Sequence, residues 1–447
     1  MHTFDEQAEA IAQANIRYAL ERIRMDPPPL DGPIDAATLR ERAGQTITAE
    51  GIGGERALKV FEEVLAPACI SGDHPRYLSF IPAAPTEASI LFDLVVGSSS
   101  FCANSWMEAA GAIFAENEAL RWLSDLAGFP KSSGGVFVSG GTAGNLSALV
   151  AARSTFRHRT GHQGRGAILT SSGAHASIAQ AGYVMDVDVM PVPGGTQLTG
   201  EDLTSFVAQL DSEDLARIFA VVGTSGTTNL GIIDDLEGIA DVCSAHNWWM
   251  HVDGAYGGAG LAAPSARPSF NGIERADSFI VDPHKWLFAP FDCCALLYRN
   301  PEHARAAHRQ HGEYLEVLYD GEWNPSDYAH HLSRRARGLP FWFSLATHGT
   351  EAYSDAVETT ISTTHAAARL IEDHPNCRLL AGPNLSIVVF ERTGWSGADY
   401  DAWSEKLLAS GEGFVVATRF EGKPALRFCI VNPNTTEADI AQILDTL

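Results

Sequence analysis

The stretch ADSFIVDPHKWLFAPFDCCALLYRN, residues 276–300, places one lysine between two apolar segments. Lys285 follows Pro283 and His284 and precedes Trp286, so its ammonium group is expected to lose hydration, which is costly. Burial also lowers the pKa of a lysine and makes the amine available as a nucleophile. Every other lysine has polar neighbours in the sequence. Lys285 is therefore the candidate for covalent chemistry.

A glycine-rich turn offers a site for an anion. In FVSGGTAGNLSALVAAR, residues 137–153, a strand ends in a turn that opens a long helix. The N–H groups exposed at such a helix start, together with Thr142, favour a negatively charged group. The turn matches neither a dinucleotide fingerprint nor a P-loop. An ordinary strand-to-helix turn is the alternative interpretation.

Three further polar positions follow apolar runs. His175 starts a helix after GAILTSS, where it has either a ligand or a structural role. VVGTSGTTNLGIIDDL offers hydroxyl and backbone donors, and its paired aspartates are expected to cap the next helix. Asp253 ends the apolar run in WWMHVDGAYGGAG. A carboxylate there would need a cation or strong donor, unless it caps a helix.

Taken together and in this order, the motifs meet the needs of pyridoxal phosphate. The phosphate requires backbone and hydroxyl donors, and the pyridine nitrogen requires a carboxylate that keeps it protonated. The aldehyde carbon requires an amine for a Schiff base. The sequence therefore predicts a pyridoxal 5'-phosphate enzyme, and an NAD enzyme is disfavoured because GxGxxG is absent.

The residues HVDGAYGG and, later, ADSFIVDPHKWL resemble the group II pyridoxal-phosphate-dependent amino-acid decarboxylases. The likeness runs from HPRYLSFIP at residue 74 to ALRFCIVNPNTTEADI at residues 425–440. It implies that Lys285 forms the Schiff base, Asp253 binds the pyridine nitrogen and His175 stacks on the ring. It also implies phosphate contacts from Gly141, Thr142, Thr228 and His284, packing of Ala255 near the ring, and a substrate pocket lined by Phe80, Pro82 and Asn104.

The chain departs from the family pattern near both the phosphate and the substrate. Asp282 stands where several members have asparagine, so it would carry a proton beside an anion or turn away. Ala83 replaces a threonine of the aromatic-specific enzymes, and Asn104 an aromatic residue. Arg427 could bind a carboxylate or form a salt bridge at the core edge. The substrate amino acid stays open.

The family's mobile loop carries a tyrosine whose place Pro325 takes here, with Tyr328 three residues further on. A loop over 311–330 with Gly312 and Gly321 is expected to act as a lid. We expect Tyr328 to supply the proton that gives an amine after CO₂ leaves. If no donor is placed, dioxygen would give an aldehyde. A non-catalytic pyridoxal-phosphate-binding protein is a further alternative.

Short apolar runs alternate with helical stretches over residues 73–300, which predicts a mostly parallel sheet with helices on both faces. Residues 4–25 and 35–66 have helical periodicity and apolar faces without a partner. The resemblance implies the aspartate-aminotransferase-like α/β fold (fold type I) as a homodimer with an interface active site. Three parts are expected. Residues 1–72 form a helical segment packed on the partner subunit. Residues 73–355 form the large cofactor-binding domain, and residues 356–447 form a small C-terminal α+β domain.

Composition excludes several classes of protein. The chain has 447 residues and a net charge of −24, which argues against a nucleic-acid partner. Its N-terminus lacks the apolar core of a signal peptide, and no apolar run is long enough to span a membrane. Seven scattered cysteines without a CxxC motif favour a reducing cytoplasm and argue against a metal site.

Overall fold

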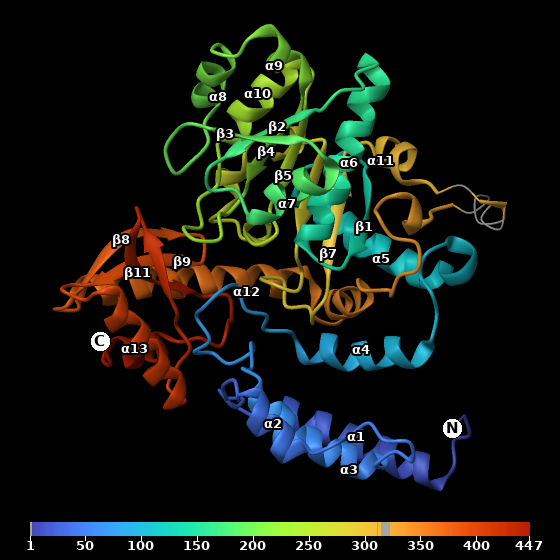
Figure 1. The fold of residues 1–447 in the computed structure, drawn as a ribbon, viewed down its shortest axis with the longest axis vertical. Coiled ribbons are helices and arrows are strands. Elements are labelled where there is room, and N and C mark those ends of the chain that lie inside the picture. The colour runs from blue at the N-terminus through green and yellow to red at the C-terminus, as the bar shows by residue number, and fades with distance from the viewer. Residues whose placement is uncertain (1, 311, 314–321) are drawn as a thin grey trace.

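The computed structural model describes residues 2–310, 312–313 and 322–447 (Figure 1). Each of the seven apolar runs expected in the large domain forms a strand, and together they make one sheet. Fold type I is confirmed by this sheet and the small antiparallel sheet that follows it. The strands of the large sheet are β1 (Gly134–Val138), β2 (Ala167–Ser171), β3 (Asp188–Val192), β4 (Ile218–Thr224), β5 (Trp249–Asp253), β6 (Ser278–Val281) and β7 (Cys294–Tyr298).

The order of the large sheet is β1-β7-β6-β5-β4-β2-β3. Neighbours from β6 to β3 pair in parallel, whereas β7 is antiparallel to both β1 and β6. Strands β2, β4, β5, β6 and β7 are buried along their whole length, as expected for a sheet covered on both faces. Because β2, β3, β4, β5 and β6 run in parallel, their carboxyl ends meet at one edge, where such sheets bind ligands.

Helices cover the two faces of this sheet. One apolar cluster joins the sheet to helices on the first face, and a second cluster joins it to helices on the other. The first face carries α6 (Gly141–Thr160), α7 (Ala176–Met185) and α11 (Pro301–His308). The second carries α5 (Trp106–Leu126), α8 (Gly200–Val207), α10 (Leu236–His246) and the first part of α12 (Leu339–Asp373), with α9 (Ser212–Arg217) leading into β4.

The C-terminal part forms a second core around the antiparallel sheet β10-β11-β9-β8. Helix α12 joins both parts (Figure 1), and it kinks at Gly349, whose φ is 78°. The expected boundary at residue 355 thus lies inside one helix. The remaining elements are β8 (Cys377–Asn384), β9 (Ile387–Arg392), α13 (Gly397–Ala409), β10 (Ala417–Phe420), β11 (Lys423–Cys429) and α14 (Glu437–Leu444).

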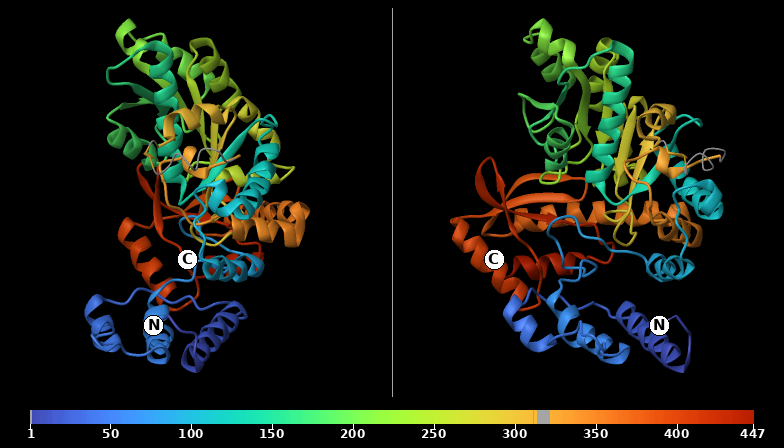
Figure 2. Two further views of the ribbon diagram at one scale, coloured as in Figure 1. Left: turned by 90° about the vertical axis from the view of Figure 1, so that its right-hand side faces the viewer. Right: turned by 45° about the vertical axis from the view of Figure 1, so that its right-hand side comes forward.

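The N-terminal helices lie at the end of the molecule opposite the large sheet (Figure 2). The expectation of continuous helical structure over residues 35–66 is wrong, because the chain is extended between Gly44 and Gly53, both with positive φ. No residue of the three helices is buried. They are α1 (Glu6–Ile23), α2 (Ala36–Ala43) and α3 (Gly54–Val60), which continues as a π-turn over Phe61–Leu65, and α4 (Glu87–Ser99) follows them.

Short 3₁₀ turns complete the fold, at Ala66–Ala68, Gly257–Ala262, Arg267–Phe270, Ile273–Arg275 and Pro325–Asp327. Within the described residues, no helix is both long and apolar enough to cross a membrane. The same residues contain no cluster of histidine, cysteine, aspartate or glutamate that could hold a metal ion.

Candidate active site

A pocket of about 240 Å³ lies where the turns after β1, β2, β4, β5 and β6 meet. Its lining includes all eight residues expected around the cofactor: Gly141, Thr142, His175, Thr228, Asp253, Ala255, His284 and Lys285. These residues span more than 140 positions of the chain, so the fold and not the local sequence brings them together.

The start of α6 forms one wall of this pocket. The helix begins at Gly141, and no side chain caps its first N–H groups. A Cβ atom at Gly141 would lie 3.1 Å from the Cβ of Ala255 and 3.2 Å from Asp282 Oδ2. A side chain would therefore fill the space in front of the helix. Glycine leaves the N-terminus of a 20-residue helix open to a negatively charged group.

Asp253 is the last residue of β5 and is buried. Its Oδ2 accepts a hydrogen bond of 2.8 Å from Asn145 Nδ2, and its Oδ1 accepts one of 3.1 Å from the N–H of Ala255. Both oxygens thus have a donor, which orients the carboxylate without a cation in contact. The predicted position at the end of a buried strand is confirmed.

Lys285 also lines the pocket, and 24% of its side chain is exposed. Its Nζ is 3.0 Å from Asp282 Oδ2. Burial alone lowers the pKa of Lys285, but the charge and hydrogen bond of Asp282, with a smaller contribution from Asp253, raise it above the usual value. The expectation that this pKa would lie below its usual value is therefore wrong, because Asp282 outweighs burial.

Asp282 does not turn away from the site. The residue is 1% exposed, and its Oδ2 lies 3.5 Å from His284 Nε2 as well as close to Lys285. Its Oδ1 has no hydrogen-bond partner among the described residues. His284 is fixed by a 2.9 Å hydrogen bond from the N–H of Cys293 to its Nδ1. A buried acid thus lies between the lysine and the start of α6.

His175 has the structural role that the sequence left open, since its Nδ1 caps α7 by accepting from the N–H of Ser177 at 3.2 Å. It also lines the pocket. Four polar side chains around Asp253 and His175 were not anticipated: Asn145, Ser177, His251 and Ser278. His251 was detectable, because it lies two residues before Asp253 and therefore shares its face of the strand.

The expected substrate residues and Tyr328 do not line this pocket within one chain. Phe80 is exposed, whereas Pro82 and Asn104 are buried elsewhere. Tyr328 is buried and stacks on Trp323, with ring centroids 4.0 Å apart. Of the predicted lid, residues 311 and 314–321 lie outside the described residues.

Arg427 forms no ion pair with an acidic side chain in the described part of the chain, so the predicted alternative of a core-edge salt bridge is not found. Its Nη2 donates to the carbonyl oxygen of Phe80. Its Nε is buried and has no hydrogen-bond partner among these residues. The guanidinium group therefore keeps bonding capacity for a ligand.

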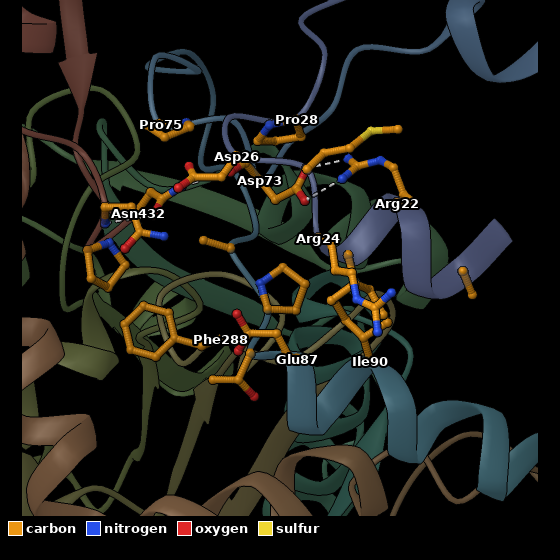
Figure 3. A pocket seen from close by; sticks show the side chains of 18 of the residues that line it. Arg22, Arg24, Asp26, Pro28, Asp73, Pro75, Glu87, Ile90, Phe288 and Asn432 are labelled. Carbon is orange, nitrogen blue, oxygen red and sulfur yellow. Dashed lines mark hydrogen bonds and ion pairs between the residues drawn. The ribbon is translucent and has the colours of Figure 1, made fainter. Parts of the chain in front are cut away.

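A larger cavity of about 690 Å³ lies elsewhere, between α1 and the body of the molecule (Figure 3). Arg22 and Asp73 form an ion pair of 2.8 Å at its side. It shares no lining residue with the pocket around Lys285. Size alone therefore does not identify the site of chemistry in this chain.

A family model described as the pyridoxal-dependent decarboxylase conserved domain matches residues 48–393, most of the chain. The chain belongs to the pyridoxal-dependent decarboxylase family. An aromatic-L-amino-acid decarboxylase of Bacillus atrophaeus is 28% identical to this decarboxylase over 432 residues, covering 93% of this chain and 89% of the relative. An L-2,4-diaminobutyrate decarboxylase of Rhizobium meliloti (strain 1021) is 30% identical over 390 residues, covering 84% and 77%. Oryza sativa TDC, solved with PLP and tryptamine, has the same fold, with a TM-score of 0.91 at 22% identity over 99% of both chains.

The decarboxylase therefore uses pyridoxal 5'-phosphate and converts an amino acid to an amine and CO₂. The predicted enzyme class and cofactor are confirmed, and the aldehyde-forming alternative has less support. The pocket fits the cofactor, since it offers helix N–H groups to a phosphate, Asp253 to a ring nitrogen and Lys285 to an aldehyde. In its wall, the hydroxyl of Thr224 is buried without a partner among the described residues, which leaves a donor for a ligand.

Proposed function

We propose that the pocket around Lys285 is the active site, at which an L-amino acid loses its α-carboxyl group. One observation carries this proposal: Lys285, Asp253 and the open start of α6 line the same small pocket at the carboxyl edge of the sheet. These are an amine, a carboxylate and an anion site, and no other described cavity combines them around a lysine.

Each residue has a role in this proposal. Lys285 would hold the cofactor through its amine and release it to the amine of the substrate, and Asp253 would hold a proton on the pyridine nitrogen. When bound, pyridoxal phosphate supplies an electron sink for the Cα–carboxylate bond. His175 covers the ring from one side. Phosphate and ring contacts complete the site, from Gly141, Thr142, Thr228, His284 and Ala255.

A homodimer with shared active sites accounts for what one chain lacks. Large apolar side chains are exposed on α4 and α5, among them Leu94 and Phe114 at 57% and 58%. Such exposure marks an interaction surface. In the dimer, the substrate contacts from Phe80, Pro82 and Asn104 and the proton from Tyr328 are expected to serve the partner's pocket. The chain thus needs a second copy to complete the site.

The substrate is an L-amino acid with an aromatic or a short cationic side chain, by analogy with the two relatives above. Arg427 is a candidate contact for a substrate carboxylate, because its guanidinium has no acidic partner among the described residues. The seven cysteines are all unpaired, and four of them are buried, which fits a reducing cytoplasm.

Borohydride reduction and peptide mapping test the assignment of the lysine. The cofactor should be fixed to Lys285, and Lys285→Ala should lose turnover by roughly a thousandfold or more, because covalent exchange is removed. Turnover is measured as CO₂, amine and peroxide release from a panel of amino acids. Lys406→Ala, which removes an exposed lysine of α13, serves as the control and should keep full activity. A label on another lysine would show that the pocket is misassigned.

A further inference from the structure

Three residues of β5 share one face of the strand. Trp249, His251 and Asp253 alternate along it, so all three point toward the side covered by α6 and α7. Ser278 of β6 pairs in register with His251. Among these residues, His251 and Ser278 have no exposed surface. The strand therefore carries a row of polar groups through the core, from its start to the active site.

Hydrogen bonds of equal length connect this row. The indole Nε1 of Trp249 donates to Ser278 Oγ at 2.8 Å, and Ser278 Oγ lies 2.8 Å from His251 Nδ1. His251 Nε2 lies 2.8 Å from Asn145 Oδ1 on α6. No polar atom of these side chains lacks a partner within the described residues.

Asn145 is a branch point. Its Nδ2 donates at 2.8 Å to Asp253 Oδ2 and at 2.8 Å to Ser177 Oγ. Ser177 Oγ then lies 2.9 Å from His175 Nδ1. The buried amide of Asn145 therefore contacts Asp253 directly. Through the hydroxyl of Ser177 it also reaches His175.

The position of each proton follows from the Asp253 end. A carboxylate only accepts hydrogen bonds, so the NH₂ group of Asn145 must face it and Oδ1 must face His251. His251 then carries its proton on Nε2. The second proton of the Asn145 amide goes to Ser177, whose hydroxyl is left to donate to His175 Nδ1. The N–H of Ser177 also donates to this Nδ1, so the hydroxyl and the N–H together place the imidazole proton of His175 on Nε2.

The Trp249 end is compatible with this assignment. An indole N–H only donates, so Ser278 accepts from it and its own hydroxyl proton is free to point at His251 Nδ1. Burial lowers the pKa of His251 to about 4, with Asp253 opposing the shift, so the ring is neutral near pH 7. When Nδ1 of this neutral ring accepts the hydroxyl proton of Ser278, the ring carries its own proton on Nε2, as the first argument requires.

We propose that Asn145, His251 and Ser278 are positioning residues that orient the Asp253 carboxylate and place the imidazole proton of His175 on Nε2. The proposal rests on the proposed function, in which Asp253 and His175 contact the cofactor. If these bonds served only to satisfy buried polar groups, any fully bonded arrangement would do. Here both branches end on residues of the pocket, and the carboxylate of Asp253 fixes the donor direction along the network.

Nitrogen NMR on the apoprotein tests the proton positions directly. With ¹⁵N-labelled histidine, the signals of His251 are identified by their loss in His251→Gln. The expected pattern between pH 6 and 8 is a protonated Nε2 and an unprotonated, hydrogen-bonded Nδ1. A proton on His251 Nδ1, or a doubly protonated ring at pH 7, would overturn the proposal. It requires the hydrogen-bond network from Trp249 through Ser278, His251 and Asn145 to Asp253 and His175, which we call the relay. This readout requires neither cofactor nor turnover.

Removing the hydroxyl of Ser278, which lies between Trp249 and His251, tests whether the network affects cofactor binding and turnover. Ser278→Ala should weaken pyridoxal phosphate binding to the apoprotein by about tenfold and lower kcat with little change in KM, because a buried partner is lost. Ser278→Thr keeps the hydroxyl and should restore most of both. Thr170→Val removes another buried hydroxyl of the same sheet, outside the relay, and serves as the matched control.

Two outcomes of this series would overturn the proposal. One is unchanged cofactor affinity and kcat in Ser278→Ala, and the other is an equal loss in Thr170→Val, which would indicate a general defect of the core. The borohydride label distinguishes the two proposals. If the label is found on Lys285 but Ser278→Ala has no effect, only the positioning role of the relay is refuted. If Lys285 of the wild type carries no label, the assignment of the active site itself is refuted.

Discussion

Lys285 and Asp282 are three positions apart in the sequence, and their side chains meet in the pocket at 3.0 Å. The acid outweighs burial, so the pKa of Lys285 lies above its usual value. The pair contributes stability that is present below the unfolded pKa and is lost as the pH rises through the higher folded value. An amine bound to Asp282 as an ammonium must lose a proton before it can attack an aldehyde.

Asp282→Asn should therefore lower the pKa of Lys285, by roughly one to three units, because burial then acts without the opposing charge. The pH midpoint of pyridoxal phosphate attachment to the apoprotein should move down with it. Stopped-flow absorbance between pH 6 and 10 measures the midpoint. Asp292→Asn, a more exposed acid of the same segment, is the control. Equal midpoints for wild type and Asp282→Asn would contradict the assigned effect of the acid.

At the residue scale, the sequence identified groups that follow a recognisable motif. Lys285 and Asp253 were found because each interrupts an apolar run. Asn145 and Ser177 were missed because they are ordinary helix residues, and only the packing of α6 and α7 on β5 shows what they contact. The pKa of Lys285 was predicted with the wrong sign because the direction of the Asp282 side chain is not encoded in local spacing.

At the scale of elements, apolar runs predicted every strand of the large sheet. Strand β8 is not evident in the sequence, because it is only partly buried along its length and contains Gly382 and Pro383, which interrupt an apolar pattern. The helical pattern over residues 35–66 failed at its glycines, where positive φ angles end the helix. Periodicity thus indicates buried elements well and half-exposed ones poorly.

The segment that carries Tyr328 gives an element-scale prediction. Burial raises the pKa of Tyr328, so its hydroxyl keeps its proton over the working range. Tyr328→Phe preserves the stacking on Trp323 and should leave the melting temperature nearly unchanged. As the sequence predicts, the product should shift from amine toward aldehyde and peroxide. Measuring this ratio in both proteins is the test, and an unchanged ratio would remove Tyr328 from the mechanism.

At the scale of the whole molecule, most of the exposed large apolar side chains among the described residues lie on α4, α5 and the N-terminal segment that holds α1, α2 and α3. Phe4 and Ile47 are exposed by 74% and 87%, although the chain is otherwise strongly acidic. Their solvent exposure is costly for a monomer, and the proposed homodimer would relieve it. The inability of one chain to bring Asn104 or Tyr328 to Lys285 points the same way.

Leu94→Glu should dissociate the proposed dimer, because an unpaired charge buried in an interface costs roughly 3–5 kcal/mol. Sedimentation velocity should then give a monomer, and turnover should fall with the fraction of dimer. Far-ultraviolet circular dichroism checks that the fold is kept. A dimer of undiminished activity would place the subunit contact away from α4.

The antiparallel strand β7 has a consequence for how the lysine is held. Because β7 pairs with β6, both ends of the connecting segment, residues 282–293, are anchored in the same sheet. A hydrogen bond also joins the two ends of this segment, where His284 Nδ1 accepts from the N–H of Cys293. A parallel strand in the place of β7 would require a long crossover connection, and Lys285 would then lie on a longer and less constrained segment. A circular permutation that places new termini within residues 282–293 should therefore release Lys285 from its fixed position and abolish the proposed chemistry, even if the rest of the sheet forms.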